Sequence, residues 1–371
     1  MKYFIYILLS IFIFTGCTQK HTQSISYEQT PKEIIKKDVK KEVLIKEQDK
    51  QEVIAQIEQE IKSDQIAIIY PSLTIGKYAL EAINSINTYL LFKDIPFSIK
   101  TIDMLIQNQK SVKNAFDTVK NENITKVIAL ITIDQLDIIL DIDGIEKINL
   151  FLPLINTYEV KNRSKLEKLN IVFGAISYKD QFKKLISYAN NKPLVELYDN
   201  SVIGNALHNY LSDYKLFYNR KINDNNGWYR SILRKNIKKM RNSAIILNTP
   251  IVKSSILLSA ITAEEVYPNK ILSTQLNYTP LLFSLTQKND RRNFIVANSI
   301  GEIPVELEEF NQLLGNNISY SWVNYACLVG VEYLISNNID YFKDLKLEQN
   351  QVVYPIKLYN VGKSSFELIR E

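Results

Sequence analysis

Short apolar runs alternate with segments of helical periodicity from residue 65 onward. The first run, Ile66–Tyr70, is apolar or aromatic at every position and ends at Pro71. The segment after it places Ile75, Ala79 and Ile86 on one face of a helix. A strand that is apolar on both faces and leads directly into a helix is the first half of a parallel βαβ unit. We therefore expect a parallel sheet to begin at residue 65.

The same alternation repeats through the rest of the chain. We expect further strands at 97–102, 126–131, 148–154, 170–174, 194–198, 216–219, 244–248, 270–275, 293–298 and 351–358. The segments between them have helical periodicity, and the last two helices are expected at 306–314 and 321–335. Strands that alternate with helices over this length predict an α/β fold with two doubly wound parallel-sheet lobes.

A polar break after residue 155 and an irregular stretch before residue 290 indicate where the chain passes from one lobe to the other. We expect the first lobe to comprise 65–155 and 290–340, and the second lobe to comprise 156–289 and 341–371. In this arrangement several crossings join the two lobes, and a cleft lies between them.

The N-terminus carries the pattern of an export signal. Residues 1–17 read MKYFIYILLSIFIFTGC, in which Lys2 is followed by the apolar segment Phe4–Phe14. That segment has the length of a signal-peptide core and is shorter than the ~20 residues of a membrane-spanning helix. One interpretation is an ordinary cleaved signal peptide in which the cysteine is coincidental.

The end of this segment, Phe14-Thr15-Gly16-Cys17, resembles the bacterial lipobox, although Phe14 replaces the preferred Leu. The resemblance implies that Cys17 is lipidated and becomes the first residue of the mature protein. Thr18 follows it in place of Asp, which by the sorting rule for such lipoproteins implies the outer membrane, facing the periplasm. Several acyl chains hold a protein on a membrane far more firmly than one. A membrane, reached through this lipid anchor, is therefore the first partner that we expect.

A polar segment, residues 18–64, separates the export signal from the first strand. Lys, Glu, Gln and Asp dominate it, and Ile35, Val39 and Val43 recur at helical spacing. This composition predicts a tether that is helical in part. The tether would act either as a spacer or as a short coiled-coil contact.

Charge and composition argue against several classes of function. The 371-residue chain has 45 basic and 40 acidic residues, and its net charge of +5 is spread out, so we expect no nucleic-acid partner. Cysteine and histidine occur twice each, too rarely for a closed zinc site, and we expect no metal and no cofactor. The short motifs of hydrolases, P-loop proteins and dinucleotide-binding enzymes do not occur, so we expect no enzyme.

One concentrated run of positive charge, Arg230–Arg241, has two interpretations. It places apolar residues on one face of a helix and cations on the other. It is either a solvated helix face or a surface for an anionic partner, such as a glycan strand or an acidic protein surface. The sequence leaves both open.

The order and spacing of the elements, together with the export signal, resemble the type I periplasmic binding protein fold over residues 65–358. Two segments, IAIIYPSLTIGKYALEAINS from Ile66 and FGAISYKDQFKKLISYA from Phe173, are similar to the lipoprotein activators of penicillin-binding proteins of the LppC type. Two features depart from that family. Thr132-Ile133-Asp134 replaces its Gly-Pro-Leu turn, and the short tether replaces its helical-repeat domain. A shared fold does not by itself carry function.

Ligands of open parallel sheets bind beyond the carboxyl ends of the strands, where helix N-termini present backbone N–H groups. This rule selects candidate ligand-binding residues in both lobes and near the crossings. They are Ser72, Thr74, Thr132 and Asn156 in the first lobe; Ser177, Tyr178, Tyr198, Asp199, Asn248 and Thr249 in the second; and Gln275 and Asn298 near the crossings. Ser, Thr and Asn are also common helix N-caps, so a structural role is the alternative for each.

Two functions fit these observations. The first is a cell-envelope lipoprotein that acts through protein contacts as an assembly or regulatory factor near the cell wall, with a cell-wall synthesis protein as partner. The second is a solute receptor that closes on a small molecule such as an amino acid or short peptide, with Ser72 and Thr74 holding an anionic group. An open, polar cleft would favour the receptor, and side chains that fill the cleft would favour protein contacts.

Overall fold

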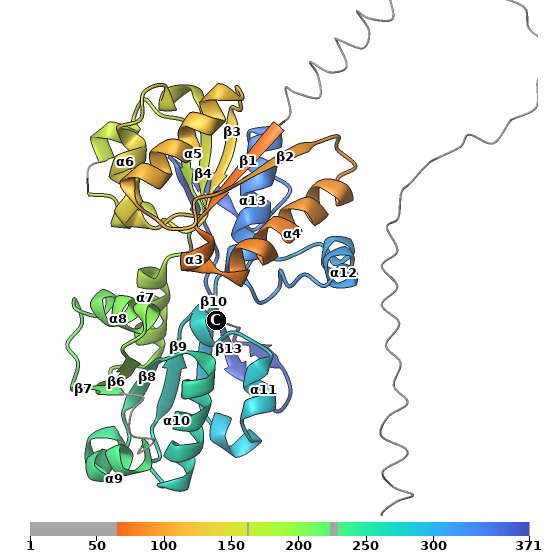
Figure 1. Ribbon diagram of the computed structural model, residues 1–371. Helices are drawn as coiled ribbons and strands as arrows, with labels where there is room; N and C mark the ends of the chain where they lie inside the picture. The colour runs from red at the N-terminus through yellow and green to blue at the C-terminus, as the bar shows by residue number, and fades with distance from the viewer. Residues whose placement is uncertain (1–64, 162, 223–228, 371) are drawn as a thin grey trace, which may run out of the picture. The chain divides into compact units, whose positions relative to one another are not determined.

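The computed structural model describes residues 65–161, 163–222 and 229–370 (Figure 1). The predicted signal peptide, the lipidation site Cys17 and the tether lie outside the described residues. Within these ranges the chain forms two seven-stranded sheets, each with a parallel centre. The predicted α/β fold with two parallel-sheet lobes is therefore confirmed.

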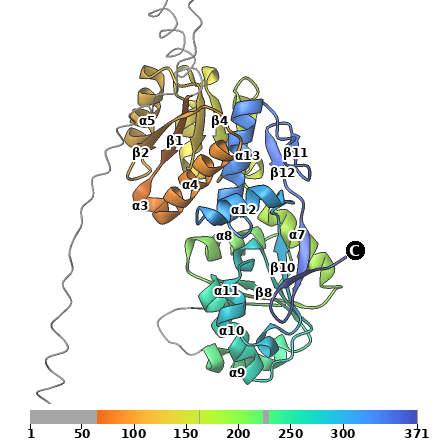
Figure 2. The same ribbon diagram turned by 90° about the vertical axis from the view of Figure 1, so that its right-hand side faces the viewer.

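The first sheet has the strand order β11-β12-β5-β4-β3-β1-β2. Its strands are β1 (Gln65–Tyr70), β2 (Ser98–Asp103), β3 (Lys126–Ala129), β4 (Asn149–Leu152), β5 (Ile171–Phe173), β11 (Lys346–Glu348) and β12 (Gln351–Val353). β1 pairs in parallel with β2 on one side and with β3 on the other. Ile66–Ile69 are buried, as expected of an inner strand whose two faces are both covered by helices (Figure 2).

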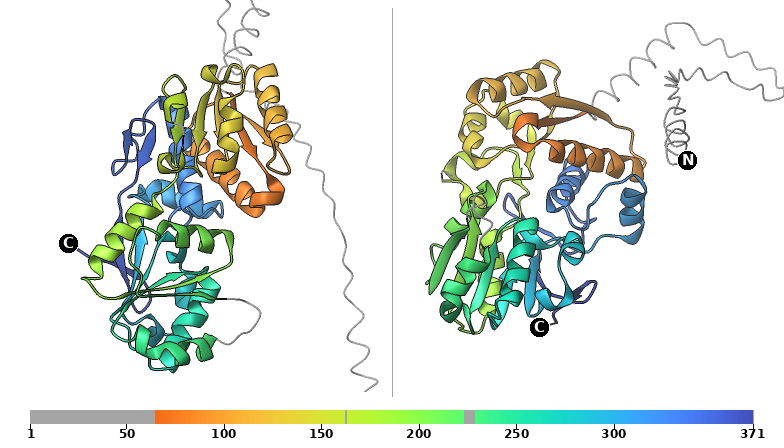
Figure 3. Two further views of the ribbon diagram at one scale, coloured as in Figure 1. Left: turned by 90° about the vertical axis from the view of Figure 1, so that its left-hand side faces the viewer. Right: turned by 60° about the horizontal axis from the view of Figure 1, so that its bottom comes forward.

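The second sheet has the order β14-β13-β10-β9-β8-β6-β7. Its strands are β6 (Leu194–Asp199), β7 (Tyr218–Ile222), β8 (Ala244–Asn248), β9 (Lys270–Ser273), β10 (Phe294–Asn298), β13 (Lys357–Val361) and β14 (Phe366–Leu368). The strands from β6 to β10 pair in parallel, while β13 is antiparallel to both β10 and β14. Helices lie on both faces of this sheet as well (Figure 3).

The helices follow the strands in the order that the periodicity predicted. They are α3 (Ser72–Ile75), α4 (Lys77–Phe92), α5 (Gln109–Asn121), α6 (Leu136–Leu140), α7 (Tyr178–Tyr188), α8 (Val202–Tyr210), α9 (Tyr229–Met240), α10 (Ile251–Ala263), α11 (Leu281–Leu285), α12 (Val305–Leu313) and α13 (Trp322–Ser336). Polar side chains fix several of their starts: Asn108 and Ser111 form a capping box at α5, and the Ser321 side chain caps α13.

Strand pairing corrects the predicted lobe boundaries in three places. β5 belongs to the first sheet, although 156–289 was expected in the second lobe. β10 belongs to the second sheet, although 290–340 was expected in the first lobe. β11 and β12 belong to the first sheet, although 341–371 was expected in the second lobe. The apolar pattern of a strand predicts that it is buried, but the neighbour with which it pairs depends on the whole fold.

The strand predicted at 351–358 is two strands in two sheets. β12 ends at Val353 and β13 begins at Lys357, with Tyr354-Pro355-Ile356 between them. Proline has no backbone N–H to donate to a ladder, so it interrupts the pairing at this point. The short link carries the chain from one lobe to the other. It lies beside the end of β5, because the Tyr354 hydroxyl donates to the Gly174 carbonyl at 2.6 Å.

The core of the first lobe is built around Phe151 on β4 and the helix α13. The Phe151 side chain is fully buried, and a side chain at Gly174 or at Gly330 of α13 would overlap its ring. Glycine at these two positions therefore lets the strand β5 and the helix approach the ring. α13 also contacts α4, β3 and β4, and most of its residues are buried.

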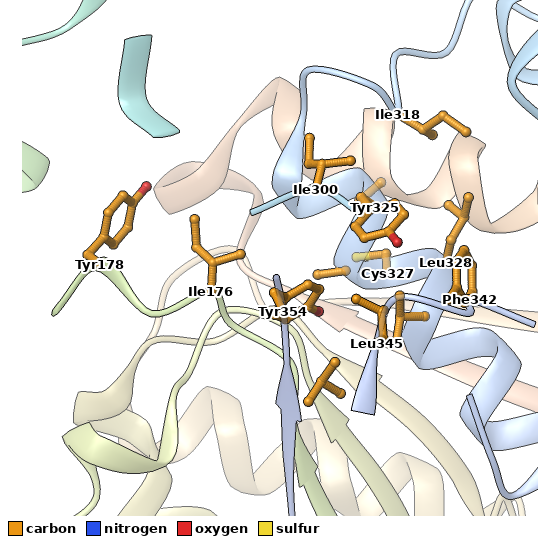
Figure 4. Close-up of a cluster of buried hydrophobic side chains, with 14 of the residues drawn as sticks. Ile176, Tyr178, Ile300, Ile318, Tyr325, Cys327, Leu328, Phe342, Leu345 and Tyr354 are labelled. Carbon is orange, nitrogen blue, oxygen red and sulfur yellow. The ribbon is translucent and has the colours of Figure 1, made fainter. Parts of the chain in front are cut away.

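Cys327 lies in this core. Figure 4 shows it among Tyr325, Leu328, Phe342 and Tyr354. The thiol is buried, and burial raises its pKa far above the ordinary value, which keeps it protonated. The same buried hydrophobic cluster continues from the first sheet into the second and includes Ile246 and Leu272 there.

Candidate functional site

The candidate residues of the first lobe lie where the sequence places them, after the carboxyl ends of the strands. Backbone groups of two of them are bonded to side chains of the same lobe. The backbone N–H of Ser72 donates to the Asp103 carboxylate at 3.0 Å, and that of Thr132 donates to the side chain of Gln107 at 2.9 Å. Thr74 is exposed on the short helix α3.

Asn156, the fourth candidate of this lobe, is buried and acts as a structural cap. Its side-chain oxygen accepts from the Tyr158 N–H at 3.2 Å, and its side-chain nitrogen donates to the Ala175 carbonyl at 2.9 Å. Glu159 completes the capping box by accepting from the Asn156 N–H. Both ends of the Asn156 amide are therefore occupied by the chain itself.

Asp199 of the second lobe forms a buried ion pair with Lys253 of α10. The Lys253 ammonium lies 2.5 Å from one carboxylate oxygen, and the two side chains are 12% and 3% exposed. The other carboxylate oxygen accepts from the hydroxyl and the N–H of Ser201, which caps α8. The carboxylate that sequence selected for a ligand thus neutralises a lysine and holds a helix start.

Tyr198 and Asn248 belong to a second internal group, centred on Glu196. The Tyr198 ring stacks on His208 with a centroid separation of 4.0 Å. His208 Nδ1 lies 2.6 Å from one oxygen of the fully buried Glu196, and the Asn248 side chain donates to the other at 2.8 Å. Burial raises the pKa of Glu196, and the bonds from Asn248 and His208 oppose that shift.

Thr249 lies in a buried polar network beside the end of β9. Its hydroxyl lies 2.7 Å from that of Ser254, and the Asn277 side chain donates to Ser254, to Ser273 and to the Thr249 carbonyl. Four buried polar atoms at this edge of the sheet have no hydrogen-bond partner. They are Asn248 Oδ1, Thr274 Oγ1, Gln275 Nε2 and Asn277 Oδ1.

The remaining candidates brace the crossings. Ser177 caps α7, and Gln181 of that helix donates to the Ser299 hydroxyl at 2.6 Å while accepting from the Gln275 N–H. The Gln275 side chain in turn accepts from the Ser299 N–H, and Asn298 accepts from the Ile300 N–H. These bonds tie α7 to the segment after β10, through which the chain returns to the first lobe.

Two groups of aromatic side chains connect the lobes, and the sequence did not reveal them. In the first aromatic cluster, the Tyr158 and Tyr210 rings meet edge-on at 5.6 Å, and the Tyr210 hydroxyl donates to Glu159 at 2.8 Å. The Tyr178 ring meets that of Trp322 edge-on at 6.5 Å. Tyr158, Glu159 and Trp322 follow or cover the first sheet, whereas Tyr178 and Tyr210 belong to helices of the second lobe.

The second aromatic cluster joins Tyr320, which precedes α13, to the second lobe. Its ring lies 5.4 Å from that of Tyr278, which also contacts Tyr359 and Phe366 at 5.3 and 4.4 Å. Edge-to-face and tilted aromatic pairs of this kind each contribute about 0.5–1.5 kcal/mol beyond their buried area. The 22 tyrosines look scattered in the sequence, but the fold gathers several of them at the contacts between lobes.

Four hollows of the surface lie away from the candidate residues. These four, in the described part of the chain, have volumes of about 370, 580, 450 and 200 Å³. None of these four is lined by any of the candidate ligand-binding residues. The candidates therefore converge on the edges of two sheets without enclosing one of these hollows.

Two features of residues 65–161, 163–222 and 229–370 bear on metal binding and on membranes. No group of three or more His, Cys, Asp or Glu side chains in these ranges is placed to hold a metal ion. None of the helices there combines the length and the apolar character needed to cross a membrane.

Comparison with known proteins places the fold. No protein family matches the chain by sequence, and no curated protein does so either. Among solved structures, a branched-chain amino acid ABC transporter protein from Thermus thermophilus with bound valine is similar with a TM-score of 0.61 and 11% identity. The match covers 83% of this chain and 96% of that one.

Two further structures have the same fold. An extracellular ligand-binding receptor from Verminephrobacter eiseniae gives a TM-score of 0.58 at 9% identity, over 82% of this chain and 99% of that chain. The C-domain of LpoA from Haemophilus influenzae, a regulator of PBP1A, gives 0.56 at 9% identity, over 83% and 100%. The chain therefore has the type I periplasmic binding protein fold, which receptors and a regulator share.

Proposed function

We propose that this protein is a cell-envelope lipoprotein that acts through protein contacts, as an assembly or regulatory factor near the cell wall. In this proposal it is not an enzyme. Acylated Cys17 anchors it to the outer membrane, and its partner is a cell-wall synthesis protein, by analogy with LpoA. One observation carries the proposal: its own side chains bond to most of the candidate polar residues at the carboxyl ends of the strands and connect the two lobes.

The charged groups at the lobe edges support this function because they already have partners within the protein. Asp199 is paired with Lys253, and Glu159 accepts from Tyr210 across the lobe contact. A small charged ligand would have to displace these bonds, and a buried charge that loses its partner costs several kcal/mol. A protein partner that binds the outer surface would leave these bonds intact.

The receptor function remains a second candidate because of one specific observation. The four unpartnered atoms beside β8 and β9 are buried polar groups that a ligand or ordered water would satisfy. The similar protein from Thermus thermophilus holds valine. Thermal unfolding in the presence of candidate solutes separates the two functions.

The experiment screens the purified protein with amino acids and short peptides. A receptor at 100 times its Kd gains about 2.7 kcal/mol of stability, because the ligand binds the native state alone. We expect no shift of Tm from any of these solutes. A shift that disappears in the variant carrying Ser72→Ala with Thr74→Ala would establish the receptor instead.

The anchor has its own measurement, mass spectrometry of the mature N-terminal peptide. We expect the first residue to be Cys17 with acyl chains on it, because the preceding segment has the order of a lipoprotein signal. A mature chain that begins at any other residue would contradict the anchor without touching the two-lobe part.

A further inference from the structure

An apolar groove runs along α10 on the surface of the second lobe. It has a volume of about 450 Å³ and is lined by residues of α9, α10 and α11, which lie side by side in Figure 1. Its lining includes the large apolar residues Val252, Ile256 and Leu285 and the small residues Ser255, Ser259 and Ala263.

The large apolar residues of this lining are exposed to solvent. Val252 is 61% exposed, Ile256 45% and Leu285 44%, and Leu281 of α11 adds another side chain at 56%. The pairs 252/256 and 281/285 have the i, i+4 spacing that puts both members on one helix face. A contiguous apolar surface of this kind marks an interaction site, whereas single exposed apolar residues do not.

The dimensions of the groove match a helix. The lining residues of α10 extend from Val252 to Ala263, which at ~1.5 Å per residue is about three helical turns. Three of the lining side chains, those of Ser255, Ser259 and Ala263, are small and allow a partner's backbone to approach closely. An amphipathic helix lays its apolar face into a groove of this form.

The helix α9, which contributes Tyr229 and Arg230 to the lining of the groove, is positive. α9 carries five Lys and Arg residues and no acidic residue, and all five are exposed. Arg230 and Arg234 both form ion pairs with the Glu264 carboxylate, at 2.6 and 2.9 Å. The ion pairs within the described ranges include neither Lys235 nor Lys238. A positive field beside an apolar groove favours an occupant with negative charge.

We propose that the groove of α9, α10 and α11 binds an amphipathic helix of a partner protein whose polar face is acidic. The apolar face of that helix packs on Val252, Ile256 and Leu285, and its carboxylates face Lys235 and Lys238. The inference rests on the proposed function and deepens it by stating where the partner binds and what chemistry it has. A second copy of this chain fits less well, because a symmetric contact would bring two basic α9 helices together.

The test is photocrosslinking in cells that produce the full chain. A photoreactive amino acid replaces Ile256 or Lys238 in separate variants, and Leu80 or Leu313, exposed residues of the first lobe, in two controls. We expect one protein to crosslink at Ile256 and Lys238 and not at the controls. Mass spectrometry of the crosslinked peptide should identify an acidic segment with apolar residues at helical spacing.

Two sets of further substitutions, each made in a chain that carries the photoreactive amino acid elsewhere, show whether the apolar groove and the charge of α9 both contribute to partner binding. Ile256→Asp should reduce crosslinking from position 238 about tenfold or more, and the triple charge reversal Lys235→Glu, Lys238→Glu and Arg241→Glu should reduce crosslinking from position 256 to a similar extent. Leu313→Asp is the matched control and should leave crosslinking from both positions unchanged. All these residues are exposed, so Tm of each variant should stay close to that of the wild type.

Other results overturn the inference. Crosslinks at the groove to lipid, to nucleic acid, to a second copy of this chain or to a basic segment would each contradict it. So would an equal yield at all four positions. A partner that crosslinks only at Leu80 or Leu313 would refute the groove and leave the proposed function standing, whereas no protein crosslink at any position, together with a solute-induced shift of Tm, would refute both.

Discussion

Replacing Asp199 with alanine is expected to destabilise the protein by about 3–5 kcal/mol, with no ligand present. The substitution removes one partner of a buried ion pair and leaves the Lys253 ammonium, whose side chain is 12% exposed, without its carboxylate. It also removes the acceptor of the Ser201 hydroxyl and N–H at the start of α8. Urea-induced unfolding, followed by tryptophan fluorescence and circular dichroism, measures the loss.

Two further variants distinguish the ion pair from a general effect of losing a carboxylate. Asp213→Ala removes an exposed carboxylate that follows α8, and should change stability by no more than ~0.5 kcal/mol. Asp199→Ala combined with Lys253→Met should recover much of the loss, because the buried ammonium is then removed together with its carboxylate. Wild-type stability of Asp199→Ala, together with the loss of a solute-induced shift, would mean that Asp199 binds a ligand after all.

Replacing Phe151 with alanine is expected to lower the free energy of unfolding of the first lobe by about 3–5 kcal/mol, the range for large aromatic residues in a core. The side chain is fully buried on an inner strand and fills the space that Gly174 and Gly330 leave open. The surrounding strand and helix cannot close the cavity without shifting β4 against α13. The midpoint of urea unfolding should fall, and the cooperativity should reveal whether the second lobe unfolds with the first.

Phe217 provides the matched control, because its side chain is 62% exposed. Phe217→Ala should leave the midpoint nearly unchanged. Gly330→Ala tests the same contact from the other side: its methyl group would overlap the Phe151 ring and should cost about 1–3 kcal/mol. If Phe151→Leu does not relieve the effect of Gly330→Ala, the two positions are not coupled as the packing requires.

The position of the candidate residues at the edges of the sheets followed from the sequence, but the bonding partners of their side chains did not. Residues after buried strands lie at the carboxyl edge of a parallel sheet wherever the chain forms βα units, so Asp199 and Asn248 were placed correctly at that edge. Their partners, Lys253 and Glu196, lie 54 and 52 residues away in the chain. Spacing along a sequence contains no information about such contacts.

The lobe contacts were missed for a related reason. Tyr158 and Tyr210 are 52 positions apart, and nothing in the local pattern around either residue distinguishes it from the other tyrosines. Only the tertiary structure brings the segment after β4, which contains Tyr158, next to the end of α8, which contains Tyr210. The basic run of α9 is the opposite case: its charge was visible in the sequence, and the structure added the apolar groove beside it.

The sequence by itself determined most of the strands and helices, and that the inner strands are parallel and buried, because periodicity and apolar runs are local properties of the chain. It did not reveal the short strands β11 and β14, or that β11, β13 and β14 pair in antiparallel fashion. It did not determine that β5, β11 and β12 join the first sheet, or that β10 joins the second. Those assignments depend on which neighbouring strand each strand pairs with. The free energy that favours one neighbour over another comes from contacts between residues far apart in the sequence. Tertiary structure also decided that the polar residues of the lobe edges bond to one another, since a buried polar group is stable where another part of the chain satisfies it.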